Sequence, residues 1–260
     1  MTQPLLLQEL SREDARARAP QSLLVLPVGA LEQHGPHLPV GTDDFAVEHI
    51  ARSAAAQAGE RIPVLVAPTL PFGSSHHHLP FGGTMSLGTE TYYRVIHDLA
   101  ESLIVSGFRR IFILNGHGGN HELIQLAARD LALKHPADLA AASYWTIAWE
   151  ALVALGVHEA GRLPGHAGVF ETSVVLALRP DLVREPRPRR DGAFAADPRG
   201  FAAPYRAELH GSWQQIEGFT DSPARASAEF GRRCLDAIAT AVSGAFVEFY
   251  EASQANEGNE

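Results

Sequence analysis

The chain has 260 residues, of which 45% are hydrophobic and 20% charged, and this ordinary globular composition excludes a disordered or fibrous protein. A formal net charge of −9 argues against nucleic acid or an anionic membrane as a partner, and a single cysteine, Cys234, excludes internal disulfides and thiolate-rich zinc sites. The 13 histidines are about twice the usual share.

The first residues of the chain do not predict a signal peptide. The first 21 residues contain three consecutive leucines followed by mixed charges, so they lack the apolar core of about 7–15 residues that a signal peptide needs. No stretch approaches the roughly 18 apolar residues of a membrane span. We therefore expect a soluble, cytoplasmic protein in which residues 1–252 form a single domain and residues 253–260 form a flexible polar tail.

Short apolar runs alternate with helical patterns along the chain. Strands are predicted, in chain order, at residues 23–28, 64–67, 111–114 and 139–144. Helices are predicted at residues 43–58, 89–106, 120–134 and 224–251. Because the strands are apolar on both faces and alternate with helices, we expect an α/β fold with a mainly parallel sheet covered by helices on both sides.

The pattern fails between residues 180 and 223, where EPRPRR and DPRG indicate a long irregular segment. A loop of this length in a compact domain usually has a function or contacts another subunit, and both possibilities stay open for residues 184–222.

Carboxylates and histidines follow two of the predicted strands. Glu32 and His34 come after the first strand, Asp43 begins the next helix, and His117 follows the third strand. Ligands of open α/β sheets bind beyond the carboxyl ends of the strands, and this mixture of oxygen and nitrogen donors suits zinc, manganese or iron. Two other interpretations remain: Asp43 is also a preferred residue for capping a helix, and Gly119 lies in a glycine-rich turn that could hold a phosphate.

Four segments, in this order, resemble the creatininase (creatinine amidohydrolase) family. They are LPVGALEQHGPHLPVGTDD, PFGSSHHHLPFGGTMSL, IFILNGHGGN and HAGVFETS. The resemblance implies a three-layer α/β/α sandwich, a homohexamer, and a centre of one or two divalent metal ions that hydrolyses a carbon–nitrogen bond in a small, often cyclic, amide.

The same resemblance implies roles for individual residues. Glu32 and His117 would bind one ion, His34 would bind the second, and Asp43 would bridge the two. His166 would carry a proton to the substrate, in a second cluster that also contains Glu171. The positions that would line the substrate pocket are Ser75, His78, Gly116 and Trp145.

The chain departs from the family pattern at two places. Gly119 stands where creatininase has a glutamate for the second metal, and Glu171 is our candidate replacement for that ligand. Arg162 and Leu163 stand near the positions where creatininase has a tryptophan and an acidic residue that hold the substrate ring. We therefore expect a substrate other than creatinine.

The predicted function is that of a metal-dependent amidohydrolase in which a metal-activated water attacks a small cyclic or formylated amide. Related hydrolytic alternatives are a nucleotide intermediate, a short peptide or an oxidised cyclic sugar or inositol derivative as substrate. An alternative of another class is a metal-dependent binding protein without catalysis.

Overall fold

Five parallel strands form the central sheet of the computed structural model, which describes residues 4–190 and 209–257, and their order is β1-β3-β2-β4-β5. The strands are β1 Leu5–Leu6, β2 Leu23–Val28, β3 Val64–Val66, β4 Arg110–Asn115 and β5 Asp138–Ser143. β2 and β4 pair over their whole length, and every residue of both is buried. Central parallel strands covered on both faces require such continuous apolar runs.

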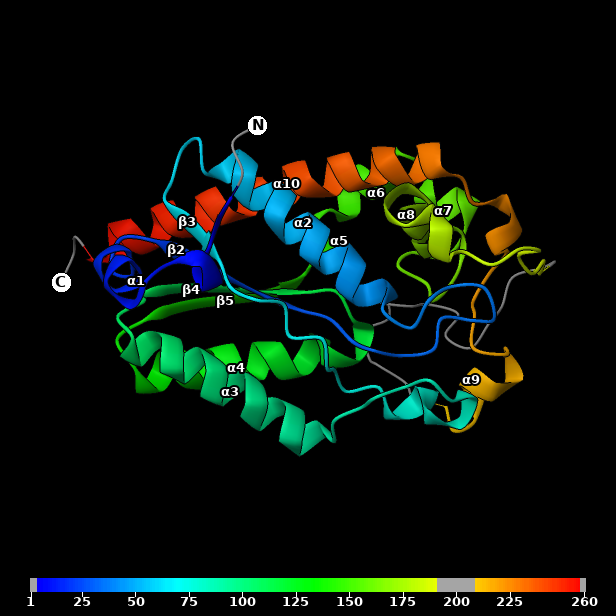
Figure 1. Ribbon diagram of the computed structural model, residues 1–260, viewed down its shortest axis with the longest axis horizontal. Helices are drawn as coiled ribbons and strands as arrows, with labels where there is room; N and C mark the ends of the chain where they lie inside the picture. Colours follow the sequence, from blue (N-terminus) through cyan, green and yellow to red (C-terminus); the bar gives the residue numbers. More distant parts are fainter. Residues whose placement is uncertain (1–3, 191–208, 258–260) are drawn as a thin grey trace.

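Helices cover both faces of the sheet, which makes three layers (Figure 1). The longer helices are α2 Thr42–Ala58, α3 Thr89–Val105, α4 His121–Lys134, α8 Val169–Leu178 and α10 Ala228–Glu257. The shorter helices are α1 Arg12–Arg18, α5 Tyr144–Ile147, α6 Trp149–Ala154, α7 Val157–Ala160 and α9 Ser212–Gln215. α2, α8 and α10 pack in the apolar core on one face, and α3 and α4 pack in the core on the other.

Turns of 3₁₀ helix connect several of these elements. They are η1 Leu7–Glu9, η2 His76–Phe81, η3 Gly118–Asn120, η4 Pro180–Leu182 and η6 Pro223–Arg225. Two of these turns lie at predicted site residues. η2 contains His78, and η3 begins directly after His117.

The observed elements confirm the predicted α/β sandwich and most of the predicted strands and helices. The expected flexible tail is wrong for residues 253–257, because α10 continues to Glu257. Ser253 is buried there and its hydroxyl donates a hydrogen bond to Asp138 at the start of β5. Sequence patterns also did not predict α8 as a helix, and the DPRG stretch lies outside the described residues.

The chain leaves β2 and β4 in opposite directions. β2 leads through α2 to β3 on one side, and β4 leads through α4 to β5 on the other. Neighbouring strands whose connections diverge in this way leave a crevice at their carboxyl ends. The segments that carry Glu32 and His117 therefore begin side by side, at the paired ends Val28 and Asn115.

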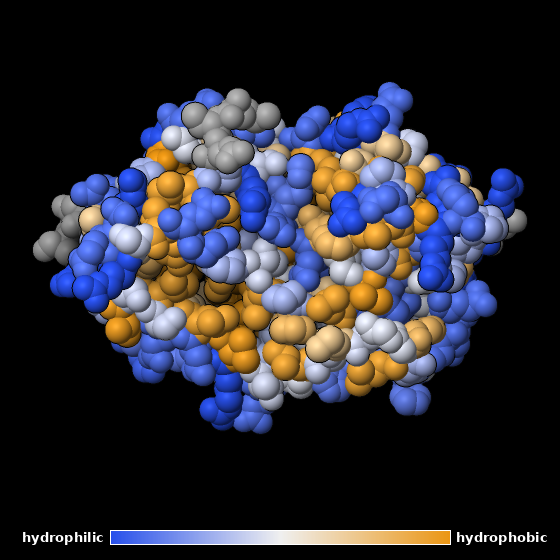
Figure 2. Space-filling view, in the orientation of Figure 1, coloured by the Kyte–Doolittle hydropathy of each residue, from blue (hydrophilic) through white to orange (hydrophobic). Residues whose placement is uncertain are grey.

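The surface of the face in Figure 1 mixes hydrophilic and hydrophobic residues, with hydrophilic ones prevailing along the rim (Figure 2). Among residues 4–190 and 209–257, no helix has both the length and the apolar character needed to cross a membrane.

Candidate metal centre

Six titratable side chains from four parts of the chain meet beyond the carboxyl ends of β2 and β4. None of them is more than 9% exposed. They are Glu32, His34, Asp43, His117, His166 and Glu171. Buried charged groups are found in proteins when they pair with each other or bind a metal.

Asp43 lies between two imidazoles. Its Oδ1 is 3.1 Å from Nε2 of His34, and its Oδ2 is 3.1 Å from Nδ1 of His117. α2 begins at Thr42 after the cap residue Gly41, and no side chain makes a capping hydrogen bond there. Asp43 therefore does not cap the helix, and its two oxygens each face a different histidine.

Backbone carbonyls fix the orientation of both histidines. Nε2 of His117 is 3.1 Å from the carbonyl oxygen of Ser74, and Nδ1 of His34 is 3.1 Å from that of Glu32. Because a carbonyl only accepts, we assign the ring hydrogens to these nitrogens. The other nitrogen of each neutral ring then turns a lone pair toward carboxylate oxygens, an arrangement that a bound cation or an added proton stabilises.

The carboxylate of Glu32 completes the same group. Its Oε1 is 3.2 Å from Nδ1 of His117, and its buried Oε2 has no hydrogen-bond partner among the described residues. An unpaired buried carboxylate oxygen is unfavourable unless a cation occupies its free side. The donors present at this place therefore fit a divalent metal ion.

Protons take the place of cations in the metal-free protein. Burial disfavours a charged imidazole, yet the carboxylates of Asp43, Glu171 and Glu32 raise the pKa of His34 to about 10. The carboxylates of Glu32 and Asp43 also hold the pKa of His117 well above its usual value despite burial. Burial raises the pKa of Asp43, but both histidines lower it further, so the net shift is downward.

Glu171 brings a carboxylate to His34 from the first turn of α8. Its Oε2 lies 3.7 Å from Nε2 of His34 and accepts a 2.5 Å hydrogen bond from the backbone N–H of Ala167. Burial, with Asp43 nearby, raises the pKa of Glu171 to about 8. His34, Asp43 and Glu171 each place one ligand atom within 4.8 Å of the others, as a shared metal ion requires.

Gly119 has no room for a side chain. A Cβ atom at this position would collide with the carbonyl oxygen of Ser74 and would lie 2.6 Å from Nε2 of His117. A glutamate at residue 119 would therefore displace the backbone that orients His117. In this chain a second carboxylate reaches His34 from α8 instead.

His166 stands beside this group with one nitrogen available. Its Nε2 is 2.9 Å from the carbonyl oxygen of Gln33 and donates to it, so Nδ1 carries the lone pair and faces Oε1 of Glu32 at 3.6 Å. Burial and the charge of His34 lower the pKa of His166 to about 3. The imidazole is therefore neutral at neutral pH, and the lone pair of its Nδ1 is directed at the cluster.

The side-chain amide of Gln33 connects this histidine to its neighbours. Nε2 of Gln33 donates to Nδ1 of His78 at 2.9 Å and to the carbonyl oxygen of Gly218 at 3.1 Å. Nε2 of Gln33 also lies 3.0 Å from Nε2 of His166. We assign no hydrogen bond to this pair, because Nε2 of His166 donates to the backbone carbonyl oxygen of Gln33. The rings of His78 and His166 stack at 4.2 Å, so Gln33 and His78 hold the orientation of His166.

The four predicted substrate positions fall into two groups. Ser75 and His78 lie at the cluster, with Oγ of Ser75 3.2 Å from Nε2 of His117 and Nε2 of His78 3.6 Å from Oε1 of Glu32. Gly116 packs against α2, and Trp145 is 2% exposed in the apolar core. Contact of Gly116 or Trp145 with a substrate stays a prediction.

Sequence reasoning missed two residues at the cluster. Gln33 lies between two predicted ligands in the same motif, which is a signal that could have found it. Trp213 comes from α9, and its ring centroid is 4.7 Å from that of His78. No pattern in the irregular segment before α9 singles out this tryptophan.

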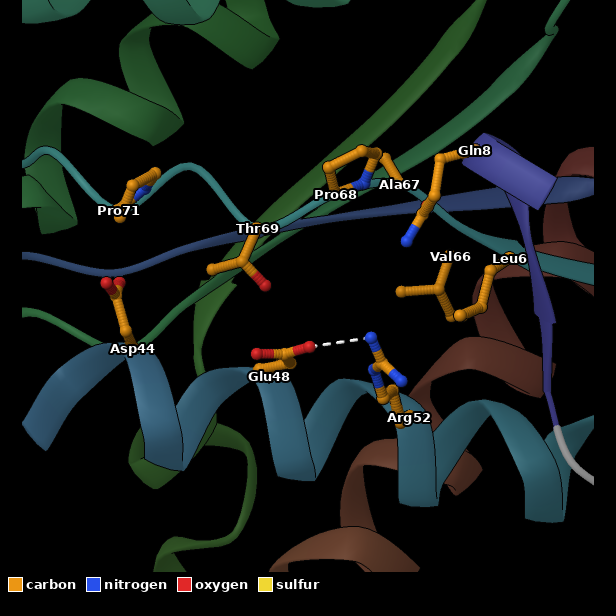
Figure 3. A pocket seen from close by; sticks show the side chains of 10 residues that line it. All are labelled: Leu6, Gln8, Asp44, Glu48, Arg52, Val66, Ala67, Pro68, Thr69 and Pro71. Carbon is orange, nitrogen blue, oxygen red and sulfur yellow. Dashed lines mark ion pairs between the residues drawn. The ribbon is translucent and has the colours of Figure 1, made fainter. Parts of the chain in front are cut away.

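A separate cavity of about 230 Å³ lies on another side of α2 (Figure 3). Asp44 faces it together with Glu48 and Arg52, which form an ion pair of 2.6 Å. Burial and the neighbouring acids Asp43 and Glu48 raise the pKa of Asp44 to about 7. Its Oδ1 has no hydrogen-bond partner among the described residues.

Comparisons with known proteins agree on one family. The Creatininase family model, described as creatinine amidohydrolase, matches residues 8–246. A creatinine amidohydrolase of Pseudomonas putida is 37% identical over 186 residues, which are 65% of this chain and 69% of that protein. A mycofactocin precursor peptide peptidase of Mycobacterium tuberculosis is 35% identical over 170 residues, which are 63% of this chain and 61% of that protein.

Solved structures show the same relationship. A manganese creatininase has a TM-score of 0.78 and 30% identity, covering 94% of this chain and 98% of its own. A mutant creatininase of the Zn-Zn type has a TM-score of 0.78 and 29% identity, covering 95% of this chain and 98% of its own.

Proposed function

This chain belongs to the creatininase family and is a metal-dependent amidohydrolase, and we propose that its buried cluster hydrolyses a carbon–nitrogen bond in a small cyclic or formylated amide. The observation that carries this proposal is Asp43, whose two oxygens face the available nitrogens of two different histidines. A carboxylate can bridge two cations because each of its oxygens binds one of them.

We assign the ligands of two ions from these distances. Glu32, Asp43 and His117 would hold one ion, and His34, Asp43 and Glu171 would hold the other. Manganese and zinc, which the solved relatives contain, both suit this set of donors. A divalent ion in such a site polarises a carbonyl and lowers the pKa of a bound water from about 15.7 toward 7.

The protein's own groups would orient the reactants and move the proton. Ser74 and Glu32 keep the hydrogens of His117 and His34 away from the ligand positions through their carbonyl oxygens. His166 would accept a proton at Nδ1 and deliver it to the leaving nitrogen, since Nδ1 of the neutral imidazole carries a lone pair and faces the cluster. Gln33 and His78 keep His166 in this orientation.

Two of the arginines in the described part of the irregular segment are hydrogen-bonded to the backbone. Arg187 donates to the carbonyl oxygen of Ala226, and Arg190 donates to that of Ile216. Both guanidinium groups are thus engaged with the backbone, whereas a nucleotide substrate needs cations directed at its phosphate. We therefore favour a small uncharged amide over a nucleotide as the substrate.

Metal analysis combined with an amide screen tests this function. We expect the purified protein to contain up to two divalent ions per chain and to hydrolyse cyclic amides or formamides. Glu32→Ala should lose both metal and turnover, because it removes a ligand that is 1% exposed. Loss of metal with unchanged turnover would exclude the metal mechanism.

We further propose that the chain acts as a single hydrolase domain, with the whole of α10 as part of it, and that it assembles into a homohexamer in the cytoplasm. Light scattering after size-exclusion chromatography measures the assembly, and cell fractionation measures the location. A monomer, or a protein found in the membrane fraction, would contradict this proposal.

A further inference from the structure

The side chain of Asn120 lies between the loops that follow β2, β3 and β4. Its Oδ1 accepts a hydrogen bond from the backbone N–H of Ser74 at 3.0 Å. Its Nδ2 donates to the carbonyl oxygen of Gly29 at 3.0 Å and to Oδ1 of Asn115 at 3.2 Å. Asn120 is fully buried, so water does not compete for these bonds. One amide therefore joins the segments that leave three neighbouring strands.

Asn120 also precedes α4, where an asparagine usually caps the helix by accepting from its backbone N–H groups. No side-chain capping hydrogen bond is made there, because the amide turns toward Ser74 and Gly29 instead. These neighbours fix which end of the amide is oxygen, since an N–H only donates and a carbonyl oxygen only accepts. Capping of α4 therefore does not account for this asparagine.

Ser74 is the residue whose carbonyl oxygen lies 3.1 Å from Nε2 of His117. It lies between β3 and η2, outside any strand or helix, so no regular hydrogen-bond ladder holds it. A Cβ atom at the preceding Gly73 would lie 2.9 Å from Oδ1 of Asn120, so the loop passes directly against the amide. Oγ of Ser75 is also near Nε2, at 3.2 Å, but a hydroxyl donates or accepts and does not fix the ring hydrogen.

Asn115 holds the backbone of the same histidine. Its Oδ1 accepts from the N–H of His117 at 3.0 Å, and its Nδ2 donates to the carbonyl oxygen of His117 at 2.6 Å. Because Asn120 donates to Oδ1 of Asn115, the two amides form one buried network. A buried network whose members are all satisfied is rigid. This network therefore restrains His117 at its backbone and, through Ser74, at its ring.

We propose that Asn120 is a positioning residue that acts through Ser74 and keeps Nδ1 of His117, rather than Nε2, available to a metal ion. This inference rests on the proposed metal-dependent function, because it concerns one of the assigned ligands. A neutral imidazole carries its hydrogen on either nitrogen unless a neighbour selects one. Apparent affinity falls with the fraction of molecules that hold the competent arrangement. Asn120 thus raises the affinity for an ion that it does not touch.

The test compares three variants of the full-length protein with wild type. Asn120→Ala removes all three hydrogen bonds, whereas Asn120→Asp keeps the shape and an acceptor for Ser74 but loses both donors. Ser253→Ala is the matched control, because it removes a buried hydrogen bond to Asp138 at the opposite end of the strands from the site. The readouts are zinc affinity by calorimetric titration, melting temperature, and NMR of isotope-labelled histidine rings, which measures the hydrogen exchange of Nε2 of His117.

We expect Asn120→Ala to lower zinc affinity about tenfold and to speed exchange of the Nε2 hydrogen of His117 by about tenfold or more. Asn120→Asp should recover most of the affinity although its melting temperature also falls. Ser253→Ala should change the melting temperature alone. Unchanged affinity and exchange in Asn120→Ala, equal affinity losses in Asn120→Ala and Asn120→Asp, or the same loss in Ser253→Ala would overturn the inference.

The wild type gives a check that does not depend on any variant folding. In the zinc-loaded wild type, NMR should show the ring hydrogen of His117 on Nε2 and protected from exchange. A hydrogen on Nδ1, or one that exchanges as fast as in an exposed histidine, would contradict the role assigned to Ser74 and Asn120.

The exchange measurement also separates this inference from the proposed function. If the wild type binds no zinc, the metal-dependent function fails, and exchange in the metal-free protein then decides on Asn120. Faster exchange at Nε2 of His117 in Asn120→Ala supports the positioning role, and equal exchange overturns it. Zinc binding and amide hydrolysis by the wild type, together with unchanged affinity and exchange in Asn120→Ala, would leave the function intact and exclude the inference alone.

Discussion

Asp43 and Asp44 are consecutive residues in the first turn of α2, but they lie in opposite electrostatic surroundings. Asp43 faces His34 and His117, and these partners keep its pKa low although burial alone would raise it. Asp44 faces a cavity that Glu48 and Arg52 also line, and burial together with the charges of Asp43 and Glu48 raises its pKa to about 7. Burial raises the pKa of both carboxyls, and the histidine partners of Asp43 alone keep that carboxylate charged and able to bind a cation.

Replacing Asp43 should cost far more activity than replacing Asp44. Asp43→Asn should lower kcat/KM more than about 100-fold and release metal. The reason is that removing a ligand shared by two ions should reduce activity more than removing a group that only orients a ligand. Asp44→Asn is the matched control and should keep both metal content and turnover within about threefold. Metal analysis and steady-state kinetics of the two variants measure this, and similar losses in both would refute the assignment of Asp43 as the bridge.

The next effect concerns the second ion. Glu171→Gln should remove about one ion per chain and lower kcat/KM by about 10–100-fold, because a neutral amide replaces the carboxylate beside His34. Glu150→Gln, at an exposed position on α6, is the control and should change neither value. Retention of two ions in Glu171→Gln would exclude Glu171 as a ligand.

Moving the carboxylate from residue 171 to residue 119 tests whether its position in α8 is required. The double variant Glu171→Ala with Gly119→Glu should not recover the second ion, because a side chain at residue 119 collides with Ser74 and His117. Recovery of metal and activity would show that the backbone at Gly119 adapts.

Much of this site follows from the sequence because parallel strands bring their carboxyl ends together. The apolar runs of β2 and β4 predict that Glu32, His34 and His117 start from one edge of the sheet. That Asp43 faces both histidines follows from where α2 packs against the sheet, which composition and periodicity do not encode. The place of Trp213 depends on contacts between Gly218 and Gln33, 185 residues apart, and between Thr220 and His166, 54 residues apart, so no local pattern could indicate it.

A smaller effect should appear in the pH dependence of metal binding. In the metal-free protein His34 has a pKa of about 10 and Glu171 of about 8, so both hold a proton at neutral pH that a metal must displace. The apparent affinity for manganese should therefore rise between pH 6 and pH 8, by up to about tenfold per pH unit for each proton released. Calorimetric titration in buffers of different ionisation enthalpy measures both the affinity and the protons, and an affinity independent of pH would contradict this assignment.

The smallest effect returns to Asp44 and concerns stability alone. Its folded-state pKa of about 7 lies above the ordinary value of 3.8, so its contribution favours folding at low pH and is lost as the pH rises through 7. Asp44→Asn removes a carboxyl that must ionise against burial, so the melting temperature of the variant relative to wild type should increase by a few degrees between pH 5 and pH 8. Scanning calorimetry of both metal-loaded proteins measures this difference. A difference that stays constant with pH would mean that Asp44 is solvated like a surface carboxylate, and the contrast with Asp43 would then come from the histidines alone.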